Sequence, residues 1–81
     1  MELNVIRPYA TDQFDIVWLE LNTPTGNYVV QPGHAPIILI LTPDQPAVFR
    51  LKSGKQESVN VRQGIADIGR DYATLIINES L

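Results

Sequence analysis

The spacing of proline and glycine is the feature that most limits what this chain can fold into. Six prolines and five glycines are distributed along 81 residues. No helix-sized window has apolar residues at the spacing of a helix face without one of them. Proline blocks a helix interior, and glycine is unfavourable there. The stretches between these breaks are short runs rich in Val, Ile and Leu, so the chain predicts strands joined by tight turns.

Eight runs have the alternation or the β-branched enrichment of strands. They cover residues 2–6, 15–21, 28–30, 37–41, 47–51, 58–61, 65–68 and 73–77. Many short strands with Gly and Pro turns predict one all-β domain over residues 1–81, built as a two-sheet β-sandwich. The alternation predicts a shared interior made of Val5, Val17, Leu19, Val30, Val59, Val61 and Ile76.

The most constrained stretch is the Pro-Gly-His-Ala-Pro run at residues 32–36. Pro32 presets the first central position of a turn, and Gly33 tolerates the positive φ that a type II turn needs next. Pro36 lacks a backbone donor, so it belongs at the start or edge of a strand. These three residues are predicted to shape the turn. The following strand, 37–41, is apolar on both faces, which predicts that it is covered on both sides or meets a partner.

Composition limits the functional classes. The chain has no cysteine, which excludes disulfides and thiolate chemistry. A net charge of −3 and scattered Lys and Arg residues argue against nucleic acid as a partner. No apolar run approaches a membrane span, and the N-terminus has no secretory leader. We therefore expect a soluble intracellular protein without direct membrane insertion.

His34 is the only histidine. It could serve as a general base, a metal ligand or a pH switch. It could also be a turn residue whose ring bonds a backbone carbonyl or packs in an interface. No hydrolytic triad is suggested by the spacing of other residues, and a metal site would have only carboxylates to add. The structural role is favoured, with no metal, no cofactor and no catalytic residue expected.

The run at 32–36, preceded by Gly-x-Tyr-x-Val and followed by Ile37-Ile38, resembles the signature of the epsilon subunit of F-type ATP synthases, which is called delta in mitochondria. Weaker matches occur in the family's order at residues 3–8, 64–68 and 74–77. The resemblance implies a β-sandwich like the N-terminal domain of that subunit. It also implies a non-catalytic central-stalk subunit of a proton- or sodium-driven rotary ATP synthase, peripheral on the cytoplasmic face of an energy-transducing membrane.

Two partners follow from the resemblance, the gamma subunit and the proteolipid ring. The resemblance assigns the gamma contact to His34, Ala35 and Ile38. It assigns the ring-facing surface to Arg7, Gly26 and Asn27. The family often has an acid where Asn27 stands, and it has Gly-Gly where this chain has Gln63-Gly64.

The sequence ends at Leu81, four residues after the last predicted strand, so we expect a short form that lacks the family's C-terminal helical hairpin, whether that form is natural or a truncation. In that form it is expected neither to inhibit ATP hydrolysis nor to bind ATP. Two alternatives stay open from the residues alone. One is a free-standing β-sandwich interaction module for another protein. The other is a small-ligand-binding sandwich or enzyme, which the lack of convergent polar groups disfavours.

Overall fold

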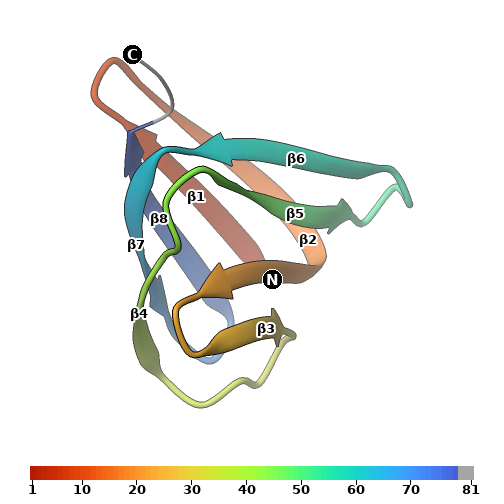
Figure 1. Cartoon of the computed structure of the whole chain (residues 1–81). Helices are drawn as coiled ribbons and strands as arrows, with labels where there is room; N and C mark the ends of the chain where they lie inside the picture. The colour runs from red at the N-terminus through yellow and green to blue at the C-terminus, as the bar shows by residue number, and fades with distance from the viewer. Residues whose placement is uncertain (79–81) are drawn as a thin grey trace.

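The computed structural model describes residues 1–78, which form eight β-strands and no helix (Figure 1). The strands are β1 (Glu2–Arg7), β2 (Ala10–Thr23), β3 (Gly26–Val30), β4 (Ile37–Ile40), β5 (Gln45–Leu51), β6 (Gln56–Val61), β7 (Gln63–Ile68) and β8 (Tyr72–Asn78). The all-β prediction is confirmed, and each predicted run is a strand. The prediction that no helical hairpin follows the last strand concerns residues 79–81, which lie outside the described range.

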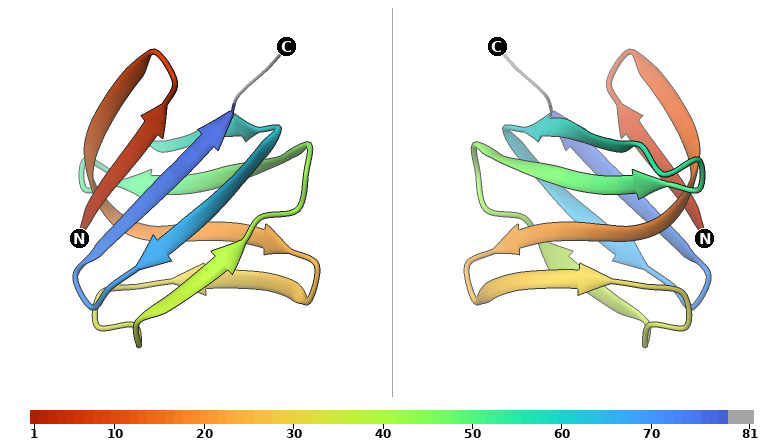
Figure 2. Two further views of the ribbon diagram at one scale, coloured as in Figure 1. Left: turned by 90° about the vertical axis from the view of Figure 1, so that its left-hand side faces the viewer. Right: turned by 90° about the vertical axis from the view of Figure 1, so that its right-hand side faces the viewer.

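Two layers share strand β2. The first layer, sheet A, has the order β4-β7-β8-β1-β2, in which only β1 and β8 run parallel. The second layer, sheet B, has the order β3-β2-β5-β6 and is antiparallel throughout. The first part of β2 pairs with β1 and its second part with β3 and β5, so this strand passes from one layer to the other (Figure 2). The two-sheet sandwich is thereby confirmed.

A β-bulge lies where β2 changes layer. The register of β2 against β5 shifts between Ile16 and Trp18, so Val17 is the extra residue. Ile16 is buried before the bulge and Leu19 is buried after it. Val17 is 44% exposed, and the prediction that it lies in the interior is wrong. The prediction assumes that side chains alternate without interruption along the strand, and a bulge breaks that alternation by adding a residue that has no partner on β5.

The interior between the layers is otherwise close to the prediction. Exposure is 8% or less at Val5, Leu19, Val30, Val59 and Val61. Ile76 is 47% exposed, and the prediction for it is wrong, because its neighbours Leu75 and Ile77 take the inward positions. Strand β8 has three consecutive apolar residues here, so alternation alone does not say which of them face inward.

The connection between β3 and β4 contains the predicted turn. The amide of His34 donates to the carbonyl of Gln31 at 3.1 Å, which closes a turn around Pro32 and Gly33. Gly33 has a φ of +87°, as predicted. Its amide donates to the carbonyl of Arg70, so the connection is tied to the turn between β7 and β8.

Asp15, which precedes the bulge in β2, forms two ion pairs. Its carboxylate lies 3.3 Å from Nζ of Lys52 and 3.4 Å from the amino group of Met1. Partial desolvation, the largest single influence, raises the pKa of Asp15, but the hydrogen bonds and charges of Lys52 and the amino group outweigh it and lower the pKa. The side chain is 64% exposed, so these pairs add little stability, and they weaken as pH falls through that lowered pKa.

Replacing Gly33 tests the backbone of the turn. A Cβ at this position would meet nothing within 4 Å, so any penalty comes from the positive φ rather than from crowding. We expect Gly33→Ala to lower the free energy of unfolding by about 1–2 kcal/mol. Gly33→Asn should cost less, because asparagine tolerates the left-handed region. Equilibrium unfolding in urea measures both variants, and equal midpoints for Gly33→Ala and the wild type would contradict the turn assignment.

A neighbouring pair on β8 tests the corrected interior. Leu75 is fully buried and Ile76 is 47% exposed. Leu75→Ala should cost about 2–5 kcal/mol because it leaves a cavity. Ile76→Ala should cost about 1 kcal/mol or less, mainly through lost strand propensity. Urea unfolding of the two variants side by side is the measurement, and a reversed order would show that β8 faces the other way.

Candidate functional site

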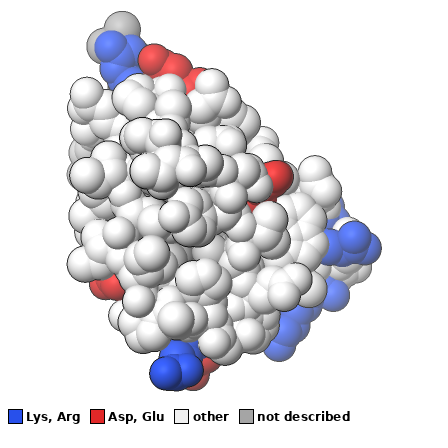
Figure 3. Space-filling view, turned by 60° about the horizontal axis from the view of Figure 1, so that its bottom comes forward, with Lys and Arg blue, Asp and Glu red and all other residues white. Residues whose placement is uncertain are grey.

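The part of the surface around β3 and β4, at the bottom of Figure 1, has few charges. When this side is turned forward, most of the Lys, Arg, Asp and Glu side chains visible in that view lie around its margin (Figure 3). Strand β4 exposes large apolar side chains there instead, at 69% for Ile38 and 70% for Ile40. Contiguous exposed apolar surface on a soluble domain marks a site of interaction.

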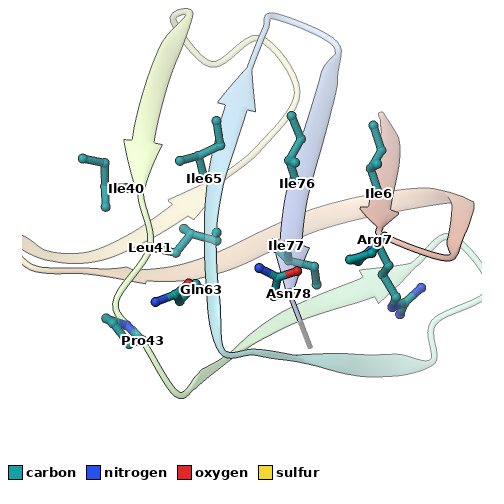
Figure 4. A pocket seen from close by; sticks show the side chains of 12 residues that line it. Ile6, Arg7, Ile40, Leu41, Pro43, Gln63, Ile65, Ile76, Ile77 and Asn78 are labelled. Carbon is teal, nitrogen blue, oxygen red and sulfur yellow. The ribbon is translucent and has the colours of Figure 1, made fainter. Parts of the chain in front are cut away.

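A row of isoleucines crosses the outer face of sheet A. Ile40 of β4 stands opposite Ile65 of β7. Ile65 stands opposite Ile76 of β8, which in turn stands beside Ile6 of β1. The four side chains are between 36% and 70% exposed. We call these four residues the isoleucine row (Figure 4); strand register assembles it from four separate segments.

A depression of about 530 Å³ borders the isoleucine row (Figure 4). Leu41 and Ile77, both nearly buried, contribute apolar lining. Gly64 also lines it, and a Cβ there would lie 2.6 Å from Cγ2 of Ile77, so glycine lets β7 and β8 approach. Polar lining comes from Gln63 and Asn78, which stand opposite each other. The depression therefore suits an apolar side chain of a docking partner with polar contacts at one side.

The three residues predicted to contact gamma lie in one continuous segment beside the isoleucine row. Ala35 is exposed and precedes β4, and Ile38 lies two residues before Ile40 on the same face of that strand. The ring of His34 is partly buried, with Nδ1 at 2.7 Å from the carbonyl oxygen of Ala35. The ring thus bonds a backbone carbonyl, which is one of the two structural roles that the sequence predicts for His34.

The three residues predicted to face the ring fall in two places. Gly26 and Asn27 begin β3, where the Asn27 amide donates to side-chain oxygens of Glu20 and Asn22 at 3.2 Å each. Arg7 ends β1 and lines the depression next to the isoleucine row. The turn before β3 and the β1–β2 hairpin are well separated in Figure 2, so the structure does not bring Arg7 together with the other two.

Most of the isoleucine row escaped the sequence analysis. The sequence shows the excess of apolar residues in strand 37–41, but it does not single out Ile6 or Ile65, and its alternation predicts an interior position for Ile76. Consecutive apolar positions in 37–41 and 73–77 were the available signal. What the sequence lacked was the order of the strands, which decides that these outward residues meet.

Within residues 1–78, no cluster of three or more acidic or histidine side chains is arranged to hold a metal ion. That same range contains no helix able to span a membrane. The polar groups that do converge, around the depression, are amides and the Arg7 guanidinium, which is ion-paired with Asp12. Amide and guanidinium groups beside apolar side chains suit contact with a protein surface.

The fold is shared with chains of two solved ATP synthases. One is from the cryo-EM structure of the central stalk and c-ring of the Tetrahymena thermophila mitochondrial enzyme, with a TM-score of 0.81 and 18% identity. The other is from the Euglena gracilis mitochondrial enzyme with OSCP, F1 and c-ring in rotational state 1, with a TM-score of 0.84 and 18% identity. The alignments cover 96% and 93% of this chain, but only 63% and 48% of those longer chains.

Comparison with curated protein sequences gives no significant match. The model of one protein family does match, over residues 1–80, and it describes the ATP synthase delta/epsilon chain, β-sandwich domain. The match covers nearly the whole sequence, and it agrees with the two-layer fold and with the resemblance carried by residues 32–36. The chain therefore belongs to the family of ATP synthase delta/epsilon chain β-sandwich domains.

Proposed function

We propose that this chain is a non-catalytic central-stalk subunit of a rotary ATP synthase. In this role it docks on the gamma subunit and the proteolipid ring and couples proton or sodium flow to ATP synthesis. The observation that carries the proposal is the exposed apolar face formed by Ile38 and the isoleucine row, in a member of this family. One structural neighbour comes from a central stalk and c-ring assembly, which supports the same role.

We assign the gamma contact to His34, Ala35 and Ile38, extended by the isoleucine row. Apolar burial favours association, and it has no preferred direction. A rotor joint must also resist sliding. The depression beside the row supplies that resistance, because a partner side chain inserted into it cannot move sideways without losing its contacts.

We assign the ring contact to Gly26 and Asn27 at the start of β3. Both are exposed, and the hydrogen bonds of Asn27 to Glu20 and Asn22 hold its side chain on the surface of sheet B. Arg7, on the separate β1–β2 hairpin, is a second candidate for the ring. With these contacts the chain would be peripheral, held by proteins at the cytoplasmic face of an energy-transducing membrane.

A free-standing interaction module is the second candidate function. The same apolar face supports it, because surface chemistry alone does not identify the partner. Copurification from native cells distinguishes the two functions: recovery of ATP synthase subunits supports the stalk role, whereas a different protein in their place supports the module.

A lysine at Ile38 tests the gamma contact. Ile38 is 69% exposed and stands opposite Asp67, so Ile38→Lys can form a cross-strand ion pair and should stay folded. In the complex its ammonium group would lose water against an apolar surface. We expect affinity for the cognate gamma subunit to fall by about tenfold or more, the equivalent of 1.4 kcal/mol. Calorimetric titration of gamma with the purified variant measures this.

Val29→Lys is the matched control. Val29 is 51% exposed on sheet B and stands opposite Glu20, so the new lysine has the same kind of carboxylate neighbour. Gamma affinity should be unchanged in this variant. Equal gamma affinities of the wild type, Ile38→Lys and Val29→Lys would show that the assigned face does not contact gamma.

Crosslinking tests the ring contact in the assembled enzyme. The chain contains no cysteine, so Asn27→Cys introduces a single thiol on this subunit. A short bifunctional reagent should join it to a proteolipid subunit, because the proposed contact places the two within reach. Ser53→Cys, in the turn between β5 and β6, is the control and should give no such product. Products from Ser53→Cys but not from Asn27→Cys would mean that the opposite end of sheet B faces the ring.

A further inference from the structure

Among the strands of residues 1–78, β4 is an edge of sheet A and has β7 as its only neighbour in the sheet order. The amide of Leu41 donates to the carbonyl of Gly64 at 3.0 Å. Backbone groups alternate in direction along an antiparallel pair, so Leu39 also turns its N–H and C=O toward β7. Ile38 and Ile40 must then turn theirs away from the sheet. The outer edge of β4 presents two backbone donors and two acceptors.

Both ends of this edge are closed to further pairing. Before Ile38, the next residue whose backbone groups point toward the free edge is Pro36, which has no N–H. After Ile40, the next such residue is Thr42, whose amide already donates to the carbonyl of Asn22 at 2.8 Å. The available edge therefore consists of Ile38 and Ile40, placed symmetrically about Leu39.

We propose that the free protein dimerises through this edge, with β4 of a second copy running antiparallel and the two-fold axis at Leu39. In this register Ile38 stands opposite Ile40 of the second copy, and Ile40 stands opposite Ile38 of the second copy. Each such pair exchanges two N–H···O bonds, so all four donors and acceptors on both edges are satisfied. Shifting the register by two residues would bring Pro36 or Thr42 into a pair and lose bonds.

The side chains favour the same occupant. Ile38 and Ile40 are 69% and 70% exposed on the outer face, and cross-strand β-branched pairs stabilise a sheet. The isoleucine row of one copy would continue across the axis into that of the other. Strand β4 has no charged residue, and Asp67 lies one strand inside the edge. Two copies therefore meet without like charges in direct opposition.

Such a dimer covers an apolar sheet edge that would otherwise be a template for uncontrolled strand pairing. It uses Ile38, which is also assigned to gamma, so the dimer and the gamma contact exclude each other. The inference goes beyond the proposed function, since it concerns the unassembled subunit. It is tested on the purified chain alone, where success or failure does not depend on whether gamma is the partner.

Sedimentation velocity over protein concentrations from about 5 to about 500 µM is the first measurement, because a dimer follows mass action. The mass should rise from one copy to two. Amide hydrogen exchange by NMR gives the location. Protection of Ile38 and Ile40 should increase with concentration, whereas that of Leu39, already bonded to β7, should not. A single-copy mass throughout, or a rise in protection confined to other strands, would overturn the proposal.

Substitutions test the register. Ile38→Lys or Ile40→Asp alone should weaken the dimer by about tenfold or more, because a charge would face an isoleucine. The double variant Ile38→Lys/Ile40→Asp should recover most of that loss, because each lysine then stands opposite an aspartate of the second copy. Ile6→Lys, at the far end of the isoleucine row, should leave the dimer unchanged. A double variant no stronger than the single variants would rule out the proposed pairing.

Discussion

The passage of β2 from one sheet to the other is the constraint on which the rest of the structure depends. One strand belongs to both layers, so the inner faces of the two sheets must close on a single interior. The bulge between Ile16 and Trp18 makes this possible, because it adds one residue and bends the strand while keeping apolar residues inward on both sides. Without it, the second part of β2 would turn its apolar face to solvent.

The closed interior also explains the candidate site. Only every second residue of a strand can face the interior, and several strands have more apolar residues than these inward positions can hold. Strands β4 and β8 have apolar residues at consecutive positions, so their surplus must face outward. Strand register then gathers the surplus into the isoleucine row rather than scattering it. The proposed docking face is thus a product of the same pairing that builds sheet A.

Strand β4 contributes to the interior, to the exposed apolar surface and to the free edge of sheet A. Its inward residue Leu39 fills the interior, its outward residues Ile38 and Ile40 form apolar surface, and its free edge offers backbone bonds. The turn at Pro32 and Gly33 fixes where this strand begins, through its bond to the β7–β8 turn. The proposed stalk role requires a surface that is apolar enough to bind yet rigid enough to transmit torque. An edge strand anchored at its start by such a turn meets both needs.

The sequence by itself determined the strands and the key turn. Proline and glycine spacing excluded helices, and Gly33 required positive φ, because both effects are local to a few backbone bonds. The run at 32–36 also carried the family resemblance. Tertiary structure alone decided that β2 serves two sheets, that Val17 and Ile76 face outward, and that Ile6, Ile40, Ile65 and Ile76 stand in one row. Those features depend on which strands pair and in what register, and such long-range pairing leaves no signature in the order of residues along any one strand.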